Sequence, residues 1–252
     1  QLNSMYVDLD VNSKRSWKNI LNYYKPSVII NAAAMTNVDE CEKNHNLSLS
    51  TNSSSILNYI DYMQHHNTHF IHISSDFVFD GKKGLYAEND ICCPVNFYGF
   101  TKFEAEKYIM RNHRNHTILR TSVIYGNTFL DNNLFMWVKN KMKNNEMLNV
   151  VDDQYRTPTY VNDLASVVLK CLEDKKYGLY HISGGERFSI FDIVCNIAES
   201  FNFNMSNINK IESKELKQFA VRPMDSSLDI NKAKKQLDFK PTLLRDALKE
   251  II

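Results

Sequence analysis

Glycine is scarce in this chain, which has seven glycines among 252 residues and no G-x-x-G-x-x-G pattern. That pattern forms the tight turn by which a dinucleotide-binding fold holds a pyrophosphate at a helix N-terminus. Apolar runs of the roughly 20 residues needed to cross a bilayer are also missing. Residues 1–10 are polar and acidic and do not resemble a secretory signal. We therefore expect no membrane partner, and the question of how a phosphate would be held stays open.

An excess of either charge is absent as well, since Lys and Arg number 30 while Asp and Glu number 29. Without a basic field, neither nucleic acid nor an anionic membrane surface is an expected partner. The five cysteines are odd in number and none forms a CxxC pair. We therefore expect reduced thiols in a cytoplasmic enzyme. No cluster of candidate ligands demands a metal, so we predict none.

Strand and helix patterns alternate along the first two thirds of the chain. β-rich apolar runs occupy residues 27–34, 69–74, 117–122 and 178–182, and helical patterns lie between them at residues 47–63, 98–112 and 163–172. A further helix, with Trp17 and Leu21, precedes the first strand. This order predicts an α/β fold with a Rossmann-like, doubly wound parallel sheet. The first run is continuous and not alternating, so we expect a central strand buried on both faces.

The remaining segments predict a smaller α/β lobe that binds substrate. Helical patterns cover residues 189–201, where Ser189 is a candidate cap, and residues 243–252. We expect a Rossmann-like dinucleotide-binding domain, incomplete at its N-terminus, over residues 1–126 and 160–183. The substrate-binding lobe is expected over residues 127–159 and 184–252, so the two parts interleave in sequence.

Tyr98 and Lys102 are four residues apart in a helical pattern and so share one face. An ammonium beside a phenol favours the phenolate, and we expect it to lower the pKa of Tyr98 toward neutrality. Such a tyrosine can give or take a proton at a carbonyl or hydroxyl, which hydride transfer requires. Ser75 follows a buried strand, and ligands of open parallel sheets bind beyond the carboxyl ends of strands. A YxxxK pair occurs by chance and a strand-end serine often only satisfies backbone groups, so the prediction depends on the joint arrangement.

Several segments carry a family resemblance. They are NAAAMTNVDECE (31–42), HISSDFVFDG (72–81), PVNFYGFTKFEAEK (94–107) and LRTSVIYG (119–126). In order and spacing they resemble the extended short-chain dehydrogenase/reductase superfamily. The first segments together with DDQYRTPTYVNDLA (152–165) and RPMDSSLD (222–229) are typical of its dTDP-4-dehydrorhamnose reductase group. The same set resembles a non-catalytic relative, the regulatory beta subunit of methionine adenosyltransferase.

The resemblance implies a role for each matching residue. Tyr98 is the implied acid/base, Lys102 is its partner and holds the nicotinamide ribose, and Ser75 is the catalytic hydroxyl. The cofactor, NADPH or NADH, is implied to contact Asp10, Val11, Ala32, Ala33, Ala34, Ser74, Tyr98, Lys102, Thr121, Ser122 and Val123. The implied substrate positions are Thr36, Val38, Ser75, Asp76 and Arg156. The fork of Arg156 suits a nucleotide diphosphate, although on the residues alone it is equally a surface arginine.

The activity implied by the resemblance is NAD(P)H-dependent reduction of a nucleotide-linked 4-keto-6-deoxy sugar in nucleotide-sugar biosynthesis, with a homodimer as a possible assembly. A nucleotide-sugar epimerase or dehydratase is an alternative, although a dehydratase typically needs a second acidic residue where Phe77 follows Asp76. A non-catalytic regulatory subunit is another. The family's first strand and Gly-rich turn are not in the sequence. We expect that N-terminal residues are omitted; true loss of this unit, or its supply by another chain, stays open.

Overall fold

A four-stranded parallel sheet forms the centre of the structure, a computed structural model that describes residues 5–126 and 133–251. The strand order is β1-β2-β3-β8. The strands span β1 (Val28–Asn31), β2 (His69–Ser75), β3 (His116–Thr121) and β8 (Gly178–His181). Each neighbouring pair is parallel. The predicted Rossmann-like α/β class is therefore confirmed.

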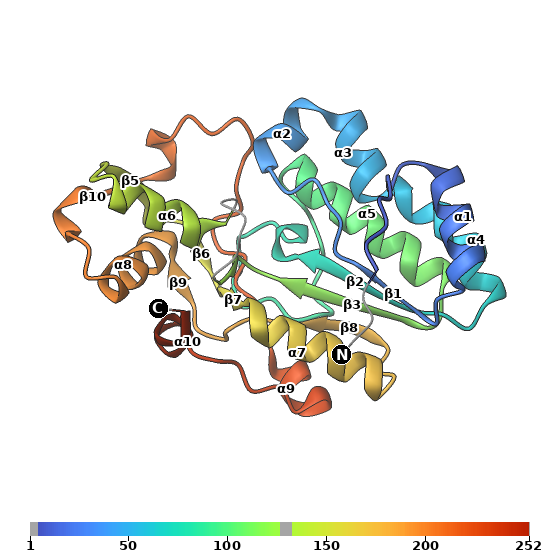
Figure 1. The fold of residues 1–252 in the computed structure, drawn as a ribbon. Coiled ribbons are helices and arrows are strands. Elements are labelled where there is room, and N and C mark those ends of the chain that lie inside the picture. The colour runs from blue at the N-terminus through green and yellow to red at the C-terminus, as the bar shows by residue number, and fades with distance from the viewer. Residues whose placement is uncertain (1–4, 127–132, 252) are drawn as a thin grey trace.

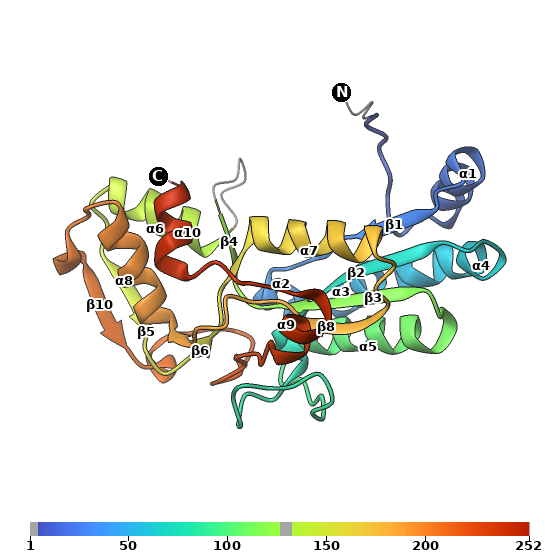
Figure 2. The same cartoon turned by 90° about the horizontal axis from the view of Figure 1, so that it is seen from below.

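Helices cover both faces of this sheet (Figures 1 and 2). The helices on the first face are α1 (Lys14–Tyr24), α2 (Val38–Lys43), α3 (His45–Asn52), α4 (Leu57–His65) and α5 (Phe97–Asn112). The second face is covered by α7 (Val161–Glu173) and α9 (Asn231–Leu237). Phe70 and Ile118 of the strands pack against α1, α4 and α5, whereas Ile71 and Leu119 pack against α7 and α9. Successive strand residues thus serve opposite cores, as a pleated strand requires.

A second lobe lies beside the carboxyl ends of the sheet, at the left of Figure 1. Its elements are α6 (Leu134–Lys143), α8 (Ile190–Ser200), α10 (Leu244–Ile251), β5 (Leu148–Val151) and β10 (Ile208–Ile211). Strands β5 and β10 pair in parallel, and the helices pack on them through a core that includes Phe135, Val150 and Ile197. Short strand pairs connect the lobe to the sheet: β4 (Ile124–Tyr125) with β7 (Thr159–Tyr160), and β6 (Tyr155–Arg156) with β9 (Phe188–Ser189).

Local sequence signals account for several helix ends. Ser189 is the N-cap of α8: its hydroxyl accepts a hydrogen bond from the Asp192 amide at 3.0 Å, and the Asp192 carboxylate accepts one from the Ser189 amide at 3.2 Å. This reciprocal capping box satisfies two amides that the helix itself leaves unpaired. The helix predicted over residues 47–63 is interrupted at residues 53–56 by a 3-10 turn. There Ser55 donates its hydroxyl to the Thr51 carbonyl at 2.8 Å, an example of serine competing with helical backbone bonds.

Strand β1 lies at the edge of the described sheet and not at its centre, contrary to the prediction from its apolar run. Ile29 is buried against α1 and α4, whereas Ile30, the next residue, is 48% exposed. The prediction failed because strand composition reports how apolar the faces are, and it does not specify which neighbours the strand has.

Helix α9 packs with the sheet domain although the sequence assigned it to the smaller lobe. Its Ala233 and Leu237 share a core with Leu119 and Val167. The sequence prediction grouped residues 184–252 because they are continuous in the chain. The position of α9 is instead decided by the burial of its apolar side chains against α7. We propose the domain division given above, with α9 counted among the helices of the sheet.

A pair of leucines on α7 tests the second core. Leu164 is 8% exposed and packs in this core, whereas Leu169 on the same helix is 57% exposed. We expect Leu164→Ala to lower the free energy of unfolding by about 2–4 kcal/mol, because it removes buried methyl groups and leaves a cavity. The matched change Leu169→Ala should cost less than about 0.5 kcal/mol. Equal losses from the two variants in urea unfolding would contradict the packing described here.

Candidate active site

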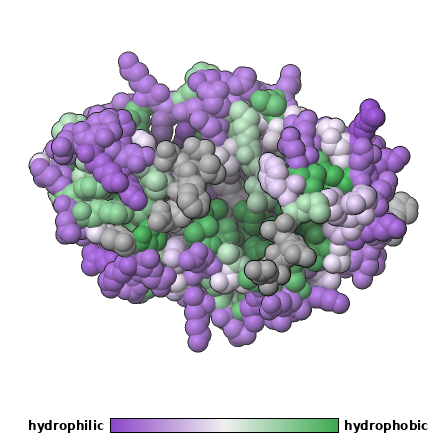
Figure 3. All heavy atoms as spheres, in the orientation of Figure 1, coloured by the Kyte–Doolittle hydropathy of each residue, from purple (hydrophilic) through white to green (hydrophobic). Residues whose placement is uncertain are grey.

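The carboxyl ends of β1, β2 and β3 open onto a cavity of about 480 Å³. In the orientation of Figure 1, apolar residues gather near the middle of the molecule, where the surface is hollowed (Figure 3). The lining residues are Ala32, Ala34, Thr36, Ile73, Ser74, Ser75, Asp76, Tyr98, Lys102, Thr121, Val123, Ile124, Tyr125, Asn133, Leu134 and Val161. They come from the sheet domain and from the first helix of the second lobe. The size and the mixture of apolar and polar side chains suit a small-molecule site.

Helix α5 brings two of these residues to the cavity. Asn96 caps its N-terminus by accepting a hydrogen bond from the Gly99 amide at 2.8 Å. A Cβ at Gly99 would lie 2.0 Å from the carbonyl oxygen of Phe77, so only glycine permits this close approach. The first turn of α5 therefore lies directly against the end of β2, and Tyr98 and Lys102 both line the cavity.

Tyr98 and Ser75 line the same cavity. Burial of the phenol, together with the negative charge of Asp76, raises the pKa of Tyr98 to about 12, and the nearby Ser75 side chain opposes the shift. The expected fall of this pKa toward neutrality is therefore wrong for this arrangement. Because the phenol keeps its proton throughout the physiological range, Tyr98 is suited to donate a proton to a developing oxyanion.

Lys102 forms its hydrogen bond with the backbone of β2. Its ammonium donates a hydrogen bond to the carbonyl oxygen of Ile73 at 2.6 Å, and its side chain is 2% exposed. Burial lowers the pKa of Lys102 to about 8, and the charge of Glu106 partly opposes this. The sequence argument assumed that a shared helix face would place the two groups in contact. The burial of both residues instead dominates their protonation.

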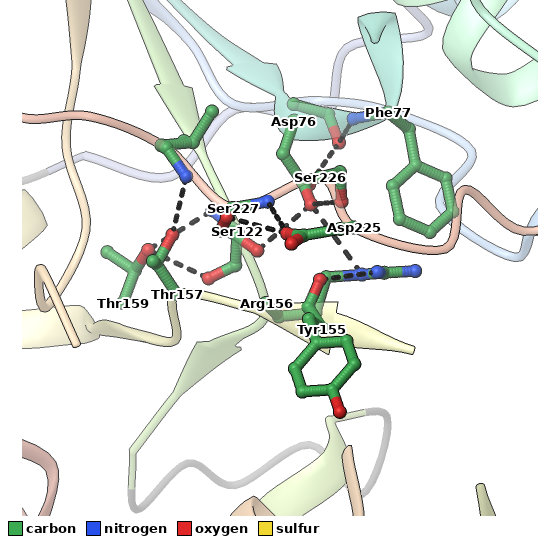
Figure 4. A network of polar contacts seen from close by, with 12 residues as sticks. Asp76, Phe77, Ser122, Tyr155, Arg156, Thr157, Thr159, Asp225, Ser226 and Ser227 are labelled. Atoms are coloured by element: carbon green, nitrogen blue, oxygen red, sulfur yellow. Dashed lines mark hydrogen bonds and ion pairs between the residues drawn. The ribbon is translucent and has the colours of Figure 1, made fainter. Parts of the chain in front are cut away.

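Asp76 is the centre of a buried polar network that joins the two lobes (Figure 4). Its carboxylate accepts hydrogen bonds from the hydroxyls of Ser75 at 3.1 Å, Ser122 at 3.0 Å and Ser226 at 2.5 Å. Burial raises the pKa of Asp76, while the guanidinium of Arg156 and the three hydroxyls oppose the shift. One oxygen of the carboxylate thus binds Ser75, and the other binds Ser122 and Ser226, the latter from a segment near the C-terminus.

Arg156 is a partner of Asp76 and lies outside the cavity lining. Its Nε is 3.7 Å from the Asp76 carboxylate, its Nη1 donates to the Tyr155 carbonyl at 2.7 Å, and its side chain is 2% exposed. The guanidinium also lies over the ring of Phe77, at 5.1 Å from its centroid. The surface position that the residues alone allowed is wrong, because the side chain is buried, and its role as a diphosphate ligand stays a prediction. Sequence spacing cannot reveal that the fold surrounds the side chain with its own partners.

The cavity brings together most of the predicted site residues. Those that line it are Ala32, Ala34, Thr36, Ser74, Ser75, Asp76, Tyr98, Lys102, Thr121 and Val123. Those that do not line it are Asp10, Val11, Ala33, Val38, Ser122 and Arg156. Ser122 is buried beside Asp76 and bonded to it, and Val38 begins α2. Asp10 is exposed, and the Val11 carbonyl accepts a hydrogen bond from the Trp17 indole at 3.0 Å. The roles of these outer residues in cofactor or substrate binding stay predictions.

Sequence inspection missed Asn52, which is 1% exposed and holds the Ala32–Thr36 wall in place. Its amide accepts a hydrogen bond from the Met35 amide at 2.7 Å and donates to the Met35 carbonyl at 3.0 Å. It also donates to the Thr101 hydroxyl at 3.0 Å, one turn after Tyr98. The sequence did contain a signal for this residue, namely an asparagine inside a helical pattern. Asparagine disfavours the helix interior, so its presence there indicates that its side chain binds other groups.

The apolar cavity residues from the second lobe were also missed, since Leu134 and Val161 have no chemical signature. The small side chains of Ala32 and Ala34 leave the cavity wall open to a flat group, and Thr121 and Val123 form the opposite wall. Val123 has a φ of 38°, a left-handed conformation that costs a β-branched residue about 1–2 kcal/mol. The surrounding fold maintains this strain at the site. These walls and the buried lysine fit the nicotinamide end of a dinucleotide.

The fold and this site together are those of the extended short-chain dehydrogenase/reductases, as the motifs indicate. A family model described as RmlD substrate binding domain matches residues 2–252. The chain belongs to this family.

Known relatives support the assignment. The chain is 34% identical to a dTDP-4-dehydrorhamnose reductase of Aggregatibacter actinomycetemcomitans, over 98% of this chain and 87% of the relative. It is 31% identical to a methionine adenosyltransferase 2 subunit beta of Xenopus laevis, over 93% of this chain and 72% of the relative. A crystal structure of a dTDP-4-dehydrorhamnose reductase from Clostridium acetobutylicum matches with a TM-score of 0.91 and 31% identity, covering 97% and 86% of the two chains. One from Bacillus anthracis, in complex with NADP, matches with a TM-score of 0.90 and 28% identity, covering 96% and 86%.

The buried lysine predicts a gain in stability when it is removed. The folded-state pKa of Lys102, about 8, lies below its ordinary value of 10.5, so the fold disfavours the ammonium. Below pH 8 this cost is complete; it declines as the pH rises toward 10.5, where both states are neutral. We expect Lys102→Met to raise the free energy of unfolding by about 1–3 kcal/mol at pH 7. The gain over the native protein should shrink toward pH 10.

The matched control is Lys107→Met on the same helix, whose lysine forms an ion pair with Glu104 near the surface. It should change the free energy of unfolding by no more than about 0.5–1 kcal/mol, without the same pH dependence. Denaturant unfolding at pH 7 and pH 10 checks both variants. A Lys102→Met protein that is less stable than the native one at pH 7 would be inconsistent with a destabilising buried ammonium.

Proposed function

We propose that this chain reduces the keto group of a nucleotide-linked 4-keto-6-deoxy sugar, as a dTDP-4-dehydrorhamnose reductase does, with NADPH or NADH as the reductant. The observation that carries the proposal is that Ser75, Tyr98 and Lys102 line one cavity, with a phenol whose pKa is about 12. Reduction of a ketone requires a group that holds a proton and releases it as negative charge develops on oxygen. The 34% identical relative is named for this activity.

The residues divide the work as follows. The Tyr98 phenol donates a hydrogen bond to the keto oxygen and transfers its proton to that oxygen as the carbonyl becomes an alcohol. The Ser75 hydroxyl, which donates to Asp76 in the resting cavity, turns its proton to the keto oxygen when substrate binds. Bound NADPH or NADH supplies the hydride for the keto carbon. Lys102 supplies a positive charge beside the site while it is protonated, and Ala32 and Ala34 allow close approach along the cavity wall. Asp76 keeps the serine hydroxyl in place, because it accepts a hydrogen bond from it at 3.1 Å.

The alternatives differ at identifiable positions. A dehydratase would use a second acidic side chain beside Asp76, but Phe77 lies there and its ring packs edge-on against Tyr98 at 5.8 Å. A regulatory role is the second candidate, because one relative at 31% identity is a methionine adenosyltransferase subunit. Such a protein would bind its partner enzyme without oxidising NADPH. Incubation of the full-length protein with NADPH and a dTDP-4-keto-6-deoxy sugar distinguishes a reductase from a regulatory subunit, because only the reductase oxidises NADPH.

The location and assembly of the protein belong to the same proposal. The five cysteines are all unpaired, which supports a reducing compartment such as the cytoplasm. No helix among the described residues is long and apolar enough to cross a membrane. A homodimer stays a prediction that analytical ultracentrifugation tests.

Removal of the phenolic oxygen gives the central prediction. We expect Tyr98→Phe to lower kcat about 10²–10⁴-fold, because the ring remains while the proton donor is lost. The control is Tyr108→Phe on the same helix, outside the cavity lining, which should keep native turnover. Steady-state oxidation of NADPH measures both variants. Near-native turnover by Tyr98→Phe, with the native protein active, would show that the acid has been assigned wrongly.

A further inference from the structure

A cluster of buried charged residues, Glu106 of α5 and Arg120 of β3, lies next to Lys102. Glu106 is one helical turn after Lys102 on α5, and its side chain is fully buried. Its Oε1 accepts hydrogen bonds from Arg120 Nε at 2.9 Å and from the Ser74 hydroxyl at 2.5 Å. Its Oε2 accepts from Arg120 Nη2 at 2.6 Å. The carboxylate is therefore held by a two-pronged arginine contact and by a residue of the cavity wall.

The cluster has more positive than negative charge. Lys102 and Arg120 are both buried cations, each 2% exposed. Glu106 forms an ion pair with Arg120 and lies one helical turn after Lys102, where its charge raises the pKa of that lysine. Arg120 also contacts His181 at 3.3 Å, and burial with this neighbouring charge lowers the pKa of His181 to about 3, so the imidazole is neutral. Without Glu106, these two buried cations would lose this negative charge in a site of low dielectric constant.

Other groups near Lys102 do not replace this carboxylate. His72 on β2 stays neutral, because burial and the charge of Lys102 lower its pKa well below the usual range. Tyr98 also stays neutral, with a pKa of about 12. Asp76 acts on Tyr98 and is engaged by Arg156. Among the described residues, Glu106 is the group whose charge raises the pKa of Lys102 against burial.

The same carboxylate reaches the cavity wall through Ser74. Ser74 is opposite Arg120 in the register of β2 and β3, so Glu106 ties both strands to α5 at one point. Ser74 lines the cavity and immediately precedes Ser75. A shift of Glu106 would change the electrostatic environment of the Lys102 ammonium. It would also displace the end of β2 that carries the Ser75 hydroxyl.

We propose that Glu106, held by Arg120, is a positioning residue for the reaction proposed above: its carboxylate keeps the ammonium of Lys102 charged in the buried site and fixes Ser74 at the cavity wall. The catalytic role of Glu106 rests on the proposed function. Its effect on the protonation of Lys102 does not, and that effect is measurable without turnover.

The test is a pH titration of Lys102 by NMR in the full chain labelled with ¹³C at lysine Cε, with Lys102→Met used to assign the signal. In Glu106→Gln the Lys102 pKa should fall by about one unit or more, and the limb of the kcat/KM profile that reports this group should move equally. Glu106→Asp, which retains the charge, should restore most of the native value. Glu104→Gln on the same helix is the matched control and should leave the pKa unchanged.

Arg120→Gln supplies an independent test with the opposite sign. It removes the cation that is paired with Glu106, so the charge of the carboxylate acts on Lys102 without that partner and the Lys102 pKa should rise. Opposite shifts in the two variants would not arise from a general loss of packing. If Glu106→Gln does not fold, the direction in Arg120→Gln decides the question.

A Glu106→Gln protein that loses stability but keeps the native Lys102 pKa would reduce the Glu106–Arg120 pair to a structural ion pair and overturn the proposal. The same holds for an unchanged or lower pKa in Arg120→Gln. A native protein that shows no reductase activity would contradict the proposed function alone, because the NMR titration would still report the charge coupling.

Discussion

The carboxylate of Asp76 is the contact through which the two lobes and Ser75 are held in one arrangement. It accepts hydrogen bonds from the hydroxyls of Ser75 and Ser122 in the sheet domain and from the hydroxyl of Ser226 in the C-terminal segment. A buried charge is costly unless it is paired and hydrogen-bonded, so these partners and Arg156 are required together. The position of the cavity between the lobes, and the direction of the Ser75 hydroxyl in it, both follow from satisfying this one group.

Charge balance is the second constraint on the site. Two buried carboxylates, Asp76 and Glu106, each face a buried arginine, and Lys102 adds a further cation without an ion-pair contact among the described residues. The fold therefore gives up stability at Lys102 and strains the backbone at Val123. Such local costs are common where chemistry is performed, because a group fully stabilised in the resting protein has little left to offer a transition state.

Much of the fold could be predicted from the sequence because its signals are local. The alternation of β-rich runs and helical stripes identified β2, β3, β8 and the helices between them, and Ser189 with Asp192 marked the start of α8. The edge position of β1 and the attachment of α9 to the sheet could not be predicted in this way. They depend on which apolar surfaces meet, and a single sequence does not encode that in any short pattern.

For the site, the sequence by itself determined the chemical inventory: Ser75 at the end of a strand, and Tyr98 and Lys102 one helical turn apart. Only the tertiary structure decided their protonation and partners. Burial gives Tyr98 a raised pKa and Lys102 a lowered one, and the fold pairs the Arg156 guanidinium with the carboxylate of Asp76. The reason is physical: spacing along a helix fixes which residues share a face, whereas desolvation and pairing depend on everything that packs against that face.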